Sequence, residues 1–176
     1  MEYTVKSGDP EKQRSGCVVI GLFEGRKLAP AGKRLDEAAQ GALAAFLRRG
    51  DIDGKSGQSL MLHNPPNLLC ERLLFIGCGR EKEFHEGRYR DAATLAARTL
   101  ASAGASEAVS YLTELEVKGR DIAWNLRHAV ECTEAALYKF DRMKSRKSDK
   151  KQSWRKLVLT VGKRSELAIG ETAVHQ

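Results

Sequence analysis

The sequence predicts an α/β domain built on a mixed, mostly parallel sheet with helices on both faces. Short apolar runs alternate along the chain with longer segments of helical periodicity, which is typical of this class. Two of the runs, Val18–Ile20 and Leu73–Ile76, are nearly continuous in apolar residues, as expected for strands buried on both faces. The length of 176 residues suits one domain with its own core.

Six segments are predicted as strands from alternating or continuous apolar residues. They are Tyr3–Lys6, Cys17–Phe23, Ser59–His63, Arg72–Ile76, Ala108–Leu112 and Lys156–Val161. The first two are joined through Ser7–Pro10, a connection too short for a crossover helix. We therefore expect the first strand to be an antiparallel addition to the sheet.

Helical periodicity fills the gaps between these strands, with apolar residues three and four positions apart. The three faces are Leu35, Ala38, Ala39, Ala42, Phe46 and Leu47; then Tyr89, Ala92, Ala93, Ala96, Leu100 and Ala103; then Ile122, Leu126, Ala129, Val130, Thr133, Leu137 and Phe140. Asp121 is the expected N-terminal cap of the last of these helices.

A further helix is expected to begin near Ser165, with that residue as its cap. The chain stops at Gln176 without a C-terminal cap signal, which predicts that it is the first part of a longer protein. The expected division is a domain over 1–164 and the start of a linker helix over 165–176.

Composition places the chain among ordinary globular proteins, with 41% hydrophobic and 30% charged residues. No apolar run approaches the roughly 20 residues that span a bilayer, so no membrane partner is predicted. The N-terminus lacks the apolar stretch of a signal peptide, which favours the cytoplasm. Cys17, Cys70, Cys78 and Cys132 form no CxxC pair and are expected to be reduced thiols.

The sequence contains only incomplete motifs for a metal-binding or nucleotide-binding site. His63, Cys70, Cys78 and His85 lie near one another in sequence, but their gaps are wider than the tight pairs of zinc sites. Gly77–Gly79 follows a buried strand, where nucleotides bind in α/β sheets, yet it lacks the third glycine and the acidic partner of a dinucleotide fingerprint. Gly54–Ser56 resembles the end of a P-loop but precedes a strand. Arg49–Gln58 is expected to form successive turns. No catalytic, metal or cofactor residue is therefore assigned to this chain.

The net charge is concentrated in one tract. Residues 139–156 hold nine basic and two acidic side chains, a net charge of +7, and the rest of the chain is balanced. Such density attracts polyanions, although charge runs are more often solvated loops. Both interpretations stay open, with Trp154 available for stacking or for anchoring a strand. The candidate nucleic-acid contacts are Arg142, Lys144, Arg146, Lys147, Lys150, Lys151, Arg155 and Lys156.

A set of segments in order along the chain resembles the N-terminal domain of bacterial leucyl (cytosol) aminopeptidases of the aminopeptidase A type. They are Val5–Gly8, Pro10–Ser15, Leu47–Gly50, Leu62–Asn67, Ile76–Gly79, Leu112–Arg120, Tyr138–Asp141 and Gly170–Glu171. The resemblance covers essentially the whole chain. It implies a macro-domain-like three-layer sandwich, in agreement with the alternation of strands and helices.

The resemblance also implies a parent enzyme that releases N-terminal amino acids from peptides. In that family a C-terminal domain holds two divalent metals, zinc or manganese, on Asp, Glu and Lys side chains. Its signature Asn-Thr-Asp-Ala-Glu-Gly-Arg is absent from this chain, so we expect the chain to be an inactive accessory domain. Family members form hexamers, and some bind DNA. An alternative function is therefore a DNA-binding module acting through the basic tract. Macro domains elsewhere bind ADP-ribose, a role the aminopeptidase versions do not retain.

Overall fold

The structure is a computed structural model that describes residues 1–144 and 153–175, without the side chain of Lys144. Seven strands form one sheet: β1 (Glu2–Ser7), β2 (Cys17–Phe23), β3 (Lys27–Leu28), β4 (Ser59–His63), β5 (Arg72–Gly79), β6 (Glu107–Ser110) and β7 (Lys156–Val161). Their order is β1-β7-β6-β2-β5-β4, with β3 paired to β2. All pairings along this order are parallel except β4 with β5, and β3 is antiparallel to β2. The mixed, mostly parallel sheet is confirmed.

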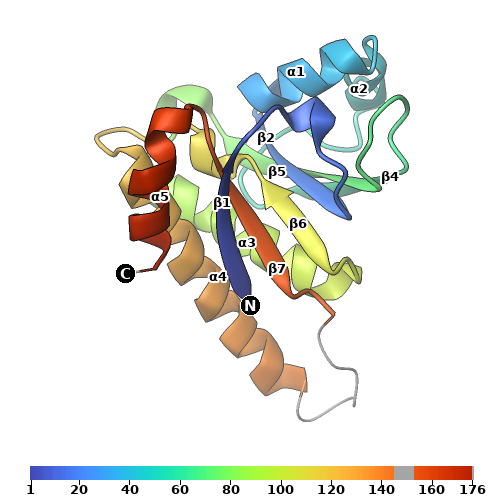
Figure 1. The fold of residues 1–176 in the computed structure, drawn as a ribbon. Helices are drawn as coiled ribbons and strands as arrows, with labels where there is room; N and C mark the ends of the chain where they lie inside the picture. Colours follow the sequence, from blue (N-terminus) through green and yellow to red (C-terminus); the bar gives the residue numbers. More distant parts are fainter. Residues whose placement is uncertain (145–152, 176) are drawn as a thin grey trace.

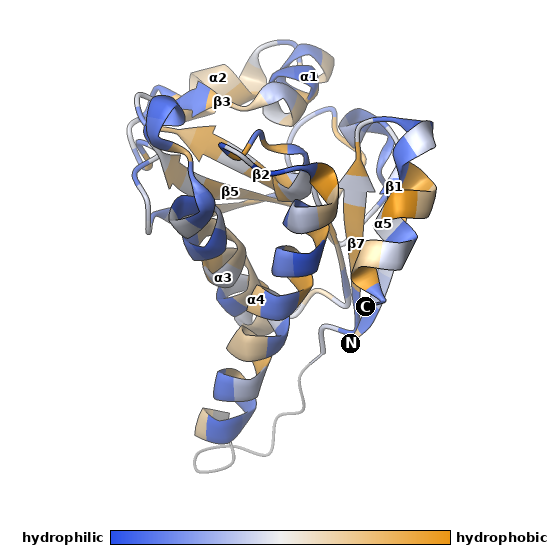
Figure 2. Ribbon diagram, turned by 90° about the vertical axis from the view of Figure 1, so that its left-hand side faces the viewer, coloured by the Kyte–Doolittle hydropathy of each residue, from blue (hydrophilic) through white to orange (hydrophobic). Residues whose placement is uncertain are grey.

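Helices cover both faces of the sheet (Figure 1). On one face lie α1 (Pro30–Ala38) and α2 (Ala42–Leu47), and on the other α3 (Glu86–Ala103), α4 (Ile122–Lys144) and α5 (Leu167–Val174). Figure 2 shows the central strands in the hydrophobic colour and the helices mixed. Within the described residues, no helix is long and apolar enough to cross a membrane.

The first strand is not an antiparallel addition, and that expectation is wrong. β1 lies parallel to β7, with Tyr3 level with Leu157, and two strands separate β1 from β2. Residues 8–16 nevertheless cross over two strands and return to the start of β2 without an α-helix. They do so through a 3-10 turn at Pro10–Lys12 packed against α1, and Tyr111 anchors this connection by donating from its hydroxyl to the carbonyl oxygen of Gly8 at 2.8 Å.

Two helix expectations also need correction. The apolar face from Leu35 to Leu47 belongs to two helices, because Gln40 and Gly41 have positive φ angles of 55° and 82°. Asp36 stabilises the break: its Oδ1 accepts from the backbone N–H groups of Leu43 and Ala44 at 3.0 Å. Ser165 is not a cap but lies within a 3-10 turn, Arg164–Glu166, that precedes α5.

The cap at the start of α4 is confirmed. Asp121 Oδ1 accepts a hydrogen bond from the backbone N–H of Trp124 at 2.9 Å. At the other end of the chain, α5 packs against α4 and β1, and Gly170 permits this approach. A Cβ at Gly170 would lie 2.8 Å from Cγ1 of Val5 and 3.1 Å from Cδ1 of Leu126. Whether α5 leads into another domain stays a prediction.

Candidate functional site: an acidic crevice at the carboxyl ends of the strands

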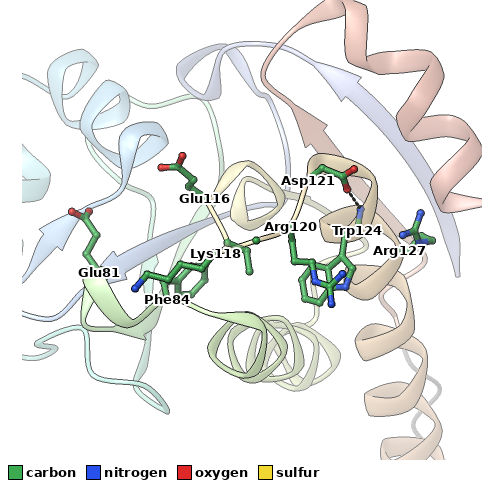
Figure 3. A pocket seen from close by; sticks show the side chains of 10 residues that line it. Glu81, Phe84, Glu116, Lys118, Arg120, Asp121, Trp124 and Arg127 are labelled. Atoms are coloured by element: carbon green, nitrogen blue, oxygen red, sulfur yellow. Dashed lines mark hydrogen bonds between the residues drawn. The ribbon is translucent and has the colours of Figure 1, made fainter.

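The carboxyl ends of the parallel strands open into a crevice of about 730 Å³. Its wall includes Phe23 at the end of β2, Glu81 after β5, Glu114 after β6 and Glu166 after β7, together with Asn125 in α4. An adjoining hollow of about 600 Å³ shares part of this wall and appears in Figure 3. We call the first cavity the acidic crevice. Ligands of open α/β sheets bind at this edge of the sheet.

The crevice carries the opposite charge to the chain as a whole. Five carboxylates line it against two basic side chains, whereas the chain has a net charge of +7. The carboxylates are Glu81, Glu114, Glu116, Asp121 and Glu166, and the basic residues are Arg120 and Lys163. Glu81 pairs with Lys27 at 2.8 Å, and Arg120 pairs with Glu86. Within the described residues, Glu114, Glu116 and Glu166 form no ion pair.

Glu114 and Glu166 converge on Gly162, just past the end of β7. A Cβ built on this glycine would lie 3.5 Å from Oε1 of Glu114 and 3.9 Å from Oε1 of Glu166. Burial of its carboxyl raises the pKa of Glu114, and the charge of Glu166 adds to the rise, while Thr160 and Arg34 oppose it. Glu166 Oε1 also accepts from the backbone N–H of Lys163 at 3.1 Å, which fixes that carboxylate.

Asn125 forms a buried part of the same wall and is only 4% exposed. Its Nδ2 donates to the carbonyl oxygens of Thr113 at 3.0 Å and Leu115 at 2.9 Å, so the orientation of the amide is fixed. Its Oδ1 has no hydrogen-bond partner in the described structure. A buried acceptor without a donor costs about 1–3 kcal/mol. This oxygen is buried within the wall, and it does not lie on the surface of the crevice.

The adjoining hollow has an aromatic floor around Trp124. Figure 3 shows Arg120 lying over the indole and Asp121 turned back to the Trp124 backbone. The guanidinium carbons of Arg120 and Arg90 lie 5.4 and 5.5 Å from the ring centroid, and the His128 ring stacks on it at 4.0 Å. With two guanidiniums and an imidazole already on this ring, Trp124 is a packed residue of the core, 5% exposed.

The glycine turn Gly77–Gly79 is covered by the loop that precedes β4. The N–H of Gly77 donates to the carbonyl oxygen of Gln58 at 2.7 Å, and that of Gly79 to Gly54 at 2.8 Å. A Cβ at Gly77 would meet the carbonyl oxygen of Lys55 at 2.0 Å, so the contact requires glycine. These two N–H groups are therefore already used and do not face a phosphate.

The predicted turns over Arg49–Gln58 are confirmed, with positive φ angles at Gly50, Gly54 and Gly57. Gln58 organises this loop, because its Oε1 accepts from the backbone N–H groups of Asp53 at 3.1 Å and of Gly54 and Lys55 at 3.0 Å. In the P-loop-like Gly54–Ser56 segment, the N–H groups of Gly54 and Lys55 are thus bonded to a side-chain amide oxygen of the same chain.

The histidines and cysteines weighed as metal ligands have other roles. His85 caps α3, with its Nδ1 accepting from the N–H of Gly87 at 3.2 Å. Cys78 is buried in β5 and donates to the carbonyl oxygen of Ile76. All four cysteines are free thiols, and burial raises the pKa of Cys78 to about 12 and of Cys70 to about 11. Across residues 1–144 and 153–175, no group of three or more His, Cys, Asp or Glu side chains is placed to hold a metal ion.

The basic tract is described only in part. Arg142 is exposed near the end of α4, with its guanidinium 5.8 Å from the ring of Tyr138, and Arg155 is exposed before β7. Lys156 begins β7 and is half-buried. Trp154 anchors the strand: it is 3% exposed, and its Nε1 donates to the carbonyl oxygen of Lys156 at 2.9 Å. Arg146, Lys147, Lys150, Lys151 and the side chain of Lys144 lie outside the described residues.

Comparison with known proteins identifies the chain's relatives. Residues 19–147 match the model of the cytosol aminopeptidase family, N-terminal domain. The chain belongs to the cytosol aminopeptidase family. A probable cytosol aminopeptidase of Thioalkalivibrio sulfidiphilus is 52% identical to this family domain over 174 residues, or 99% of the chain. The chain spans 35% of the length of that relative, and the family model that it matches describes the N-terminal domain.

Solved structures confirm the fold of the family domain. A tomato leucine aminopeptidase variant superposes with a TM-score of 0.71 at 20% identity, over 99% of this chain and 36% of that one. A Trypanosoma brucei macrodomain in complex with ADP superposes with a TM-score of 0.67 at 10% identity, over 98% of this chain and 69% of that one. The macro-domain-like architecture is therefore confirmed.

The acidic crevice was not among the predicted sites. Its residues are far apart in the chain, but a signal was present, because acidic residues follow the ends of four strands. These are Glu24 after β2, Glu81 after β5, Glu114 after β6 and Glu166 after β7. The carboxyl ends of parallel strands meet at one edge of a sheet, so this repetition predicts an acidic edge.

Proposed function

We propose that this chain is the accessory, non-catalytic domain of a cytoplasmic, metal-dependent leucyl aminopeptidase that removes N-terminal amino acids from peptides in protein turnover. One observation carries the proposal: a relative named as an aminopeptidase matches 99% of this chain, yet nearly two thirds of that relative lies beyond the match. The hydrolytic site is expected in the part that the match leaves out.

The residues of this chain do not fit a two-metal centre. Such a centre needs several carboxylates or histidines converging on the ions. The described ranges bring no three such side chains together, and the acidic crevice spreads its carboxylates along a wall instead. The two divalent ions, manganese or zinc, that the family resemblance implies are therefore proposed for the remainder of the parent protein.

The test compares this chain with the full-length parent. Both are assayed on leucine-p-nitroanilide with manganese added. We expect turnover by the full-length protein and none by this chain. Clear turnover by the 176-residue chain would disprove the accessory role. Absence of turnover by the full-length protein with either manganese or zinc would disprove the assigned activity.

Partners follow from the same proposal. The domain contacts its own C-terminal catalytic domain, and α5 offers an apolar side chain for that contact, because Ile169 is 51% exposed on a helix that packs against α4 and β1. The full-length protein is proposed to form a homo-hexamer. Light scattering measures the mass directly, and a monomeric full-length protein would contradict this assembly.

A second candidate function is contact with DNA through the basic tract. Its support is the concentration of the whole net charge in residues 139–156, together with the exposure of Arg142 and Arg155. Affinity for duplex DNA should fall with salt, with a logarithmic slope of roughly −0.9 per phosphate contacted. Replacing Lys144, Arg146, Lys147, Lys150 and Lys151 by Gln should flatten the slope, and an unchanged slope would exclude the tract as the contact.

A further inference from the structure

Strand β4 forms one edge of the sheet (Figure 1). It pairs with β5 on one side, and among the described residues no strand lies on its other side. The opposite edge strand, β1, is protected against pairing, because it exposes the charged side chains of Glu2 and Lys6 and because α5 packs against it. β4 is therefore the edge at which another strand can add to the sheet.

The pairing of β4 with β5 determines which backbone groups of β4 face outward. The N–H of Gly77 donates to the carbonyl oxygen of Gln58 at 2.7 Å. Antiparallel strands alternate bonded and non-bonded pairs, so the register makes Leu60 and Leu62 the residues whose backbone is bonded to β5. The N–H and C=O groups of the alternate residues point away from β5, and across residues 1–144 and 153–175 they have no hydrogen-bond partner. These residues are Ser59, Met61 and His63.

β4 also lacks the features that protect a sheet edge. Residues 56–70 contain no Asp, Glu, Lys or Arg, although these residues make up 30% of the chain. The strand contains no proline, and its register with β5 has no bulge. Charged side chains, prolines and bulges are what usually keep an edge strand from pairing. A second strand can therefore approach β4 without charge repulsion and without a missing donor.

We propose that β4 pairs in antiparallel orientation with β4 of a second copy of this chain, about a two-fold axis through Met61. In this register Met61 lies opposite Met61 of the second copy, and Ser59 lies opposite His63 of the second copy. All the paired residues point their N–H and C=O groups toward the other strand, so each pair exchanges two hydrogen bonds. An axis through Leu60 or Leu62 would leave one outward-facing residue without a partner.

The side chains of β4 favour the same register. Leu60 would lie opposite Leu62 of the second copy, on the sheet face where both residues pack against the core. Met61 would meet its counterpart on the other face, where it packs against the core that α3 covers. The polar Ser59 and His63 are exposed at the two ends of the strand. The apolar residues of both faces would thus continue across the contact as cross-strand pairs.

This symmetry is the reason for choosing a second copy as the occupant. A two-fold contact needs a surface that is complementary to itself, and a strand with an apolar centre, polar ends and outward-facing groups at alternate residues has that property. A two-fold contact also closes, so the expected product is a dimer and not a filament. The proposal concerns the 176-residue chain, and it rests neither on peptidase activity nor on the hexamer proposed for the full-length protein.

Sedimentation velocity of the 176-residue chain, from micromolar to millimolar concentration, tests the proposal. The average mass should rise with concentration from 19.4 kDa toward twice that value and stop there. A contact through one short strand buries little surface, so the dimer should be weak and should dissociate on dilution.

Two charge variants test the register. Ser59→Lys with His63→Lys places lysine opposite lysine at both ends of the contact and should weaken the dimer about tenfold. The matched control, Ser59→Lys with His63→Glu, places lysine opposite glutamate and should dimerise at least as tightly as the unmodified chain. Both variants change the same two exposed positions, and thermal unfolding should show that both are folded. A parallel pairing would weaken both variants equally.

Amide hydrogen exchange provides an independent measurement. The N–H groups of Ser59, Met61 and His63 should exchange more slowly at high than at low protein concentration. Those of Leu60 and Leu62 are bonded to β5 in either state and should change little. Three outcomes would overturn the proposal: a mass that stays at 19.4 kDa or grows beyond the dimer, equal dimerisation of the two charge variants, or concentration-dependent protection at strands other than β4.

Discussion

The side chain of Gln58 should stabilise the loop that covers β5, and replacing this residue tests that role. Its Oε1 accepts three backbone N–H groups within 3.1 Å, from Asp53, Gly54 and Lys55, and the first two of these bonds are partly buried. Gln58→Leu keeps the approximate size of the side chain and removes the acceptor. Water reaches the exposed N–H of Lys55, so that bond is replaced at little cost.

The magnitude follows from the two partly buried bonds. Each is worth about 0.5–1.5 kcal/mol, which gives a loss of about 2 kcal/mol in the free energy of unfolding. For a domain of this size, that corresponds to a decrease in Tm of about 4–8 °C. Gln58→Glu retains an oxygen at the same position and should stay within about 0.5 kcal/mol of the unmodified chain.

Urea unfolding followed by circular dichroism measures both variants, and amide hydrogen exchange reports on the loop. We expect faster exchange at Asp53 and Gly54 in Gln58→Leu and little change in Gln58→Glu. If Gln58→Leu unfolds within 0.5 kcal/mol of the unmodified chain, or if the two variants are equally destabilised, the three-bond account of this loop is wrong.

Three further changes test other parts of the structure. Asp121→Ala removes the cap that accepts from Trp124 and should cost about 1 kcal/mol of unfolding free energy in urea titrations, whereas Asp121→Ser should recover most of it. Gly170→Ala places a methyl 2.8 Å from Val5 and should cost about 1–3 kcal/mol, measured as a lower Tm. Because Glu114 has a raised pKa, the folded state binds more protons and loses stability as pH rises above 4.5. Glu114→Gln should therefore be more stable than the unmodified chain at pH 7 and equally stable at pH 4; a lower Tm at pH 7 would contradict the raised pKa.

Local pattern was sufficient to predict most strands. The boundaries of Cys17–Phe23, Ser59–His63 and Lys156–Val161 agree with β2, β4 and β7, since an apolar run between turn residues is a local property. The neighbours of β1 were not predictable in this way. Its partner lies about 150 residues away, and no pattern within the first twenty residues specifies it. The two-residue strand β3 is too short to show any period.

The helix break and the crevice illustrate two further limits. The apolar spacing continues through Gln40 and Gly41, so it conceals a break that depends on backbone angles and on the Asp36 side chain. The crevice depends on convergence: Glu114 and Glu166 meet only because β6 and β7 are adjacent and parallel. Strand order is a tertiary property, and residues that it brings together are not neighbours in any local window.

The adjacency of β1 and β7 has a consequence for how this domain can be produced. The family match covers residues 19–147, and a polypeptide cut to those limits would lack both strands and leave β6 as an open edge. During synthesis on the ribosome, β1 would likewise stay unpaired until Lys156–Val161, its partner strand β7, had emerged. Expression vectors for this domain should therefore run from Met1 through the end of α5, and shorter versions are expected to aggregate.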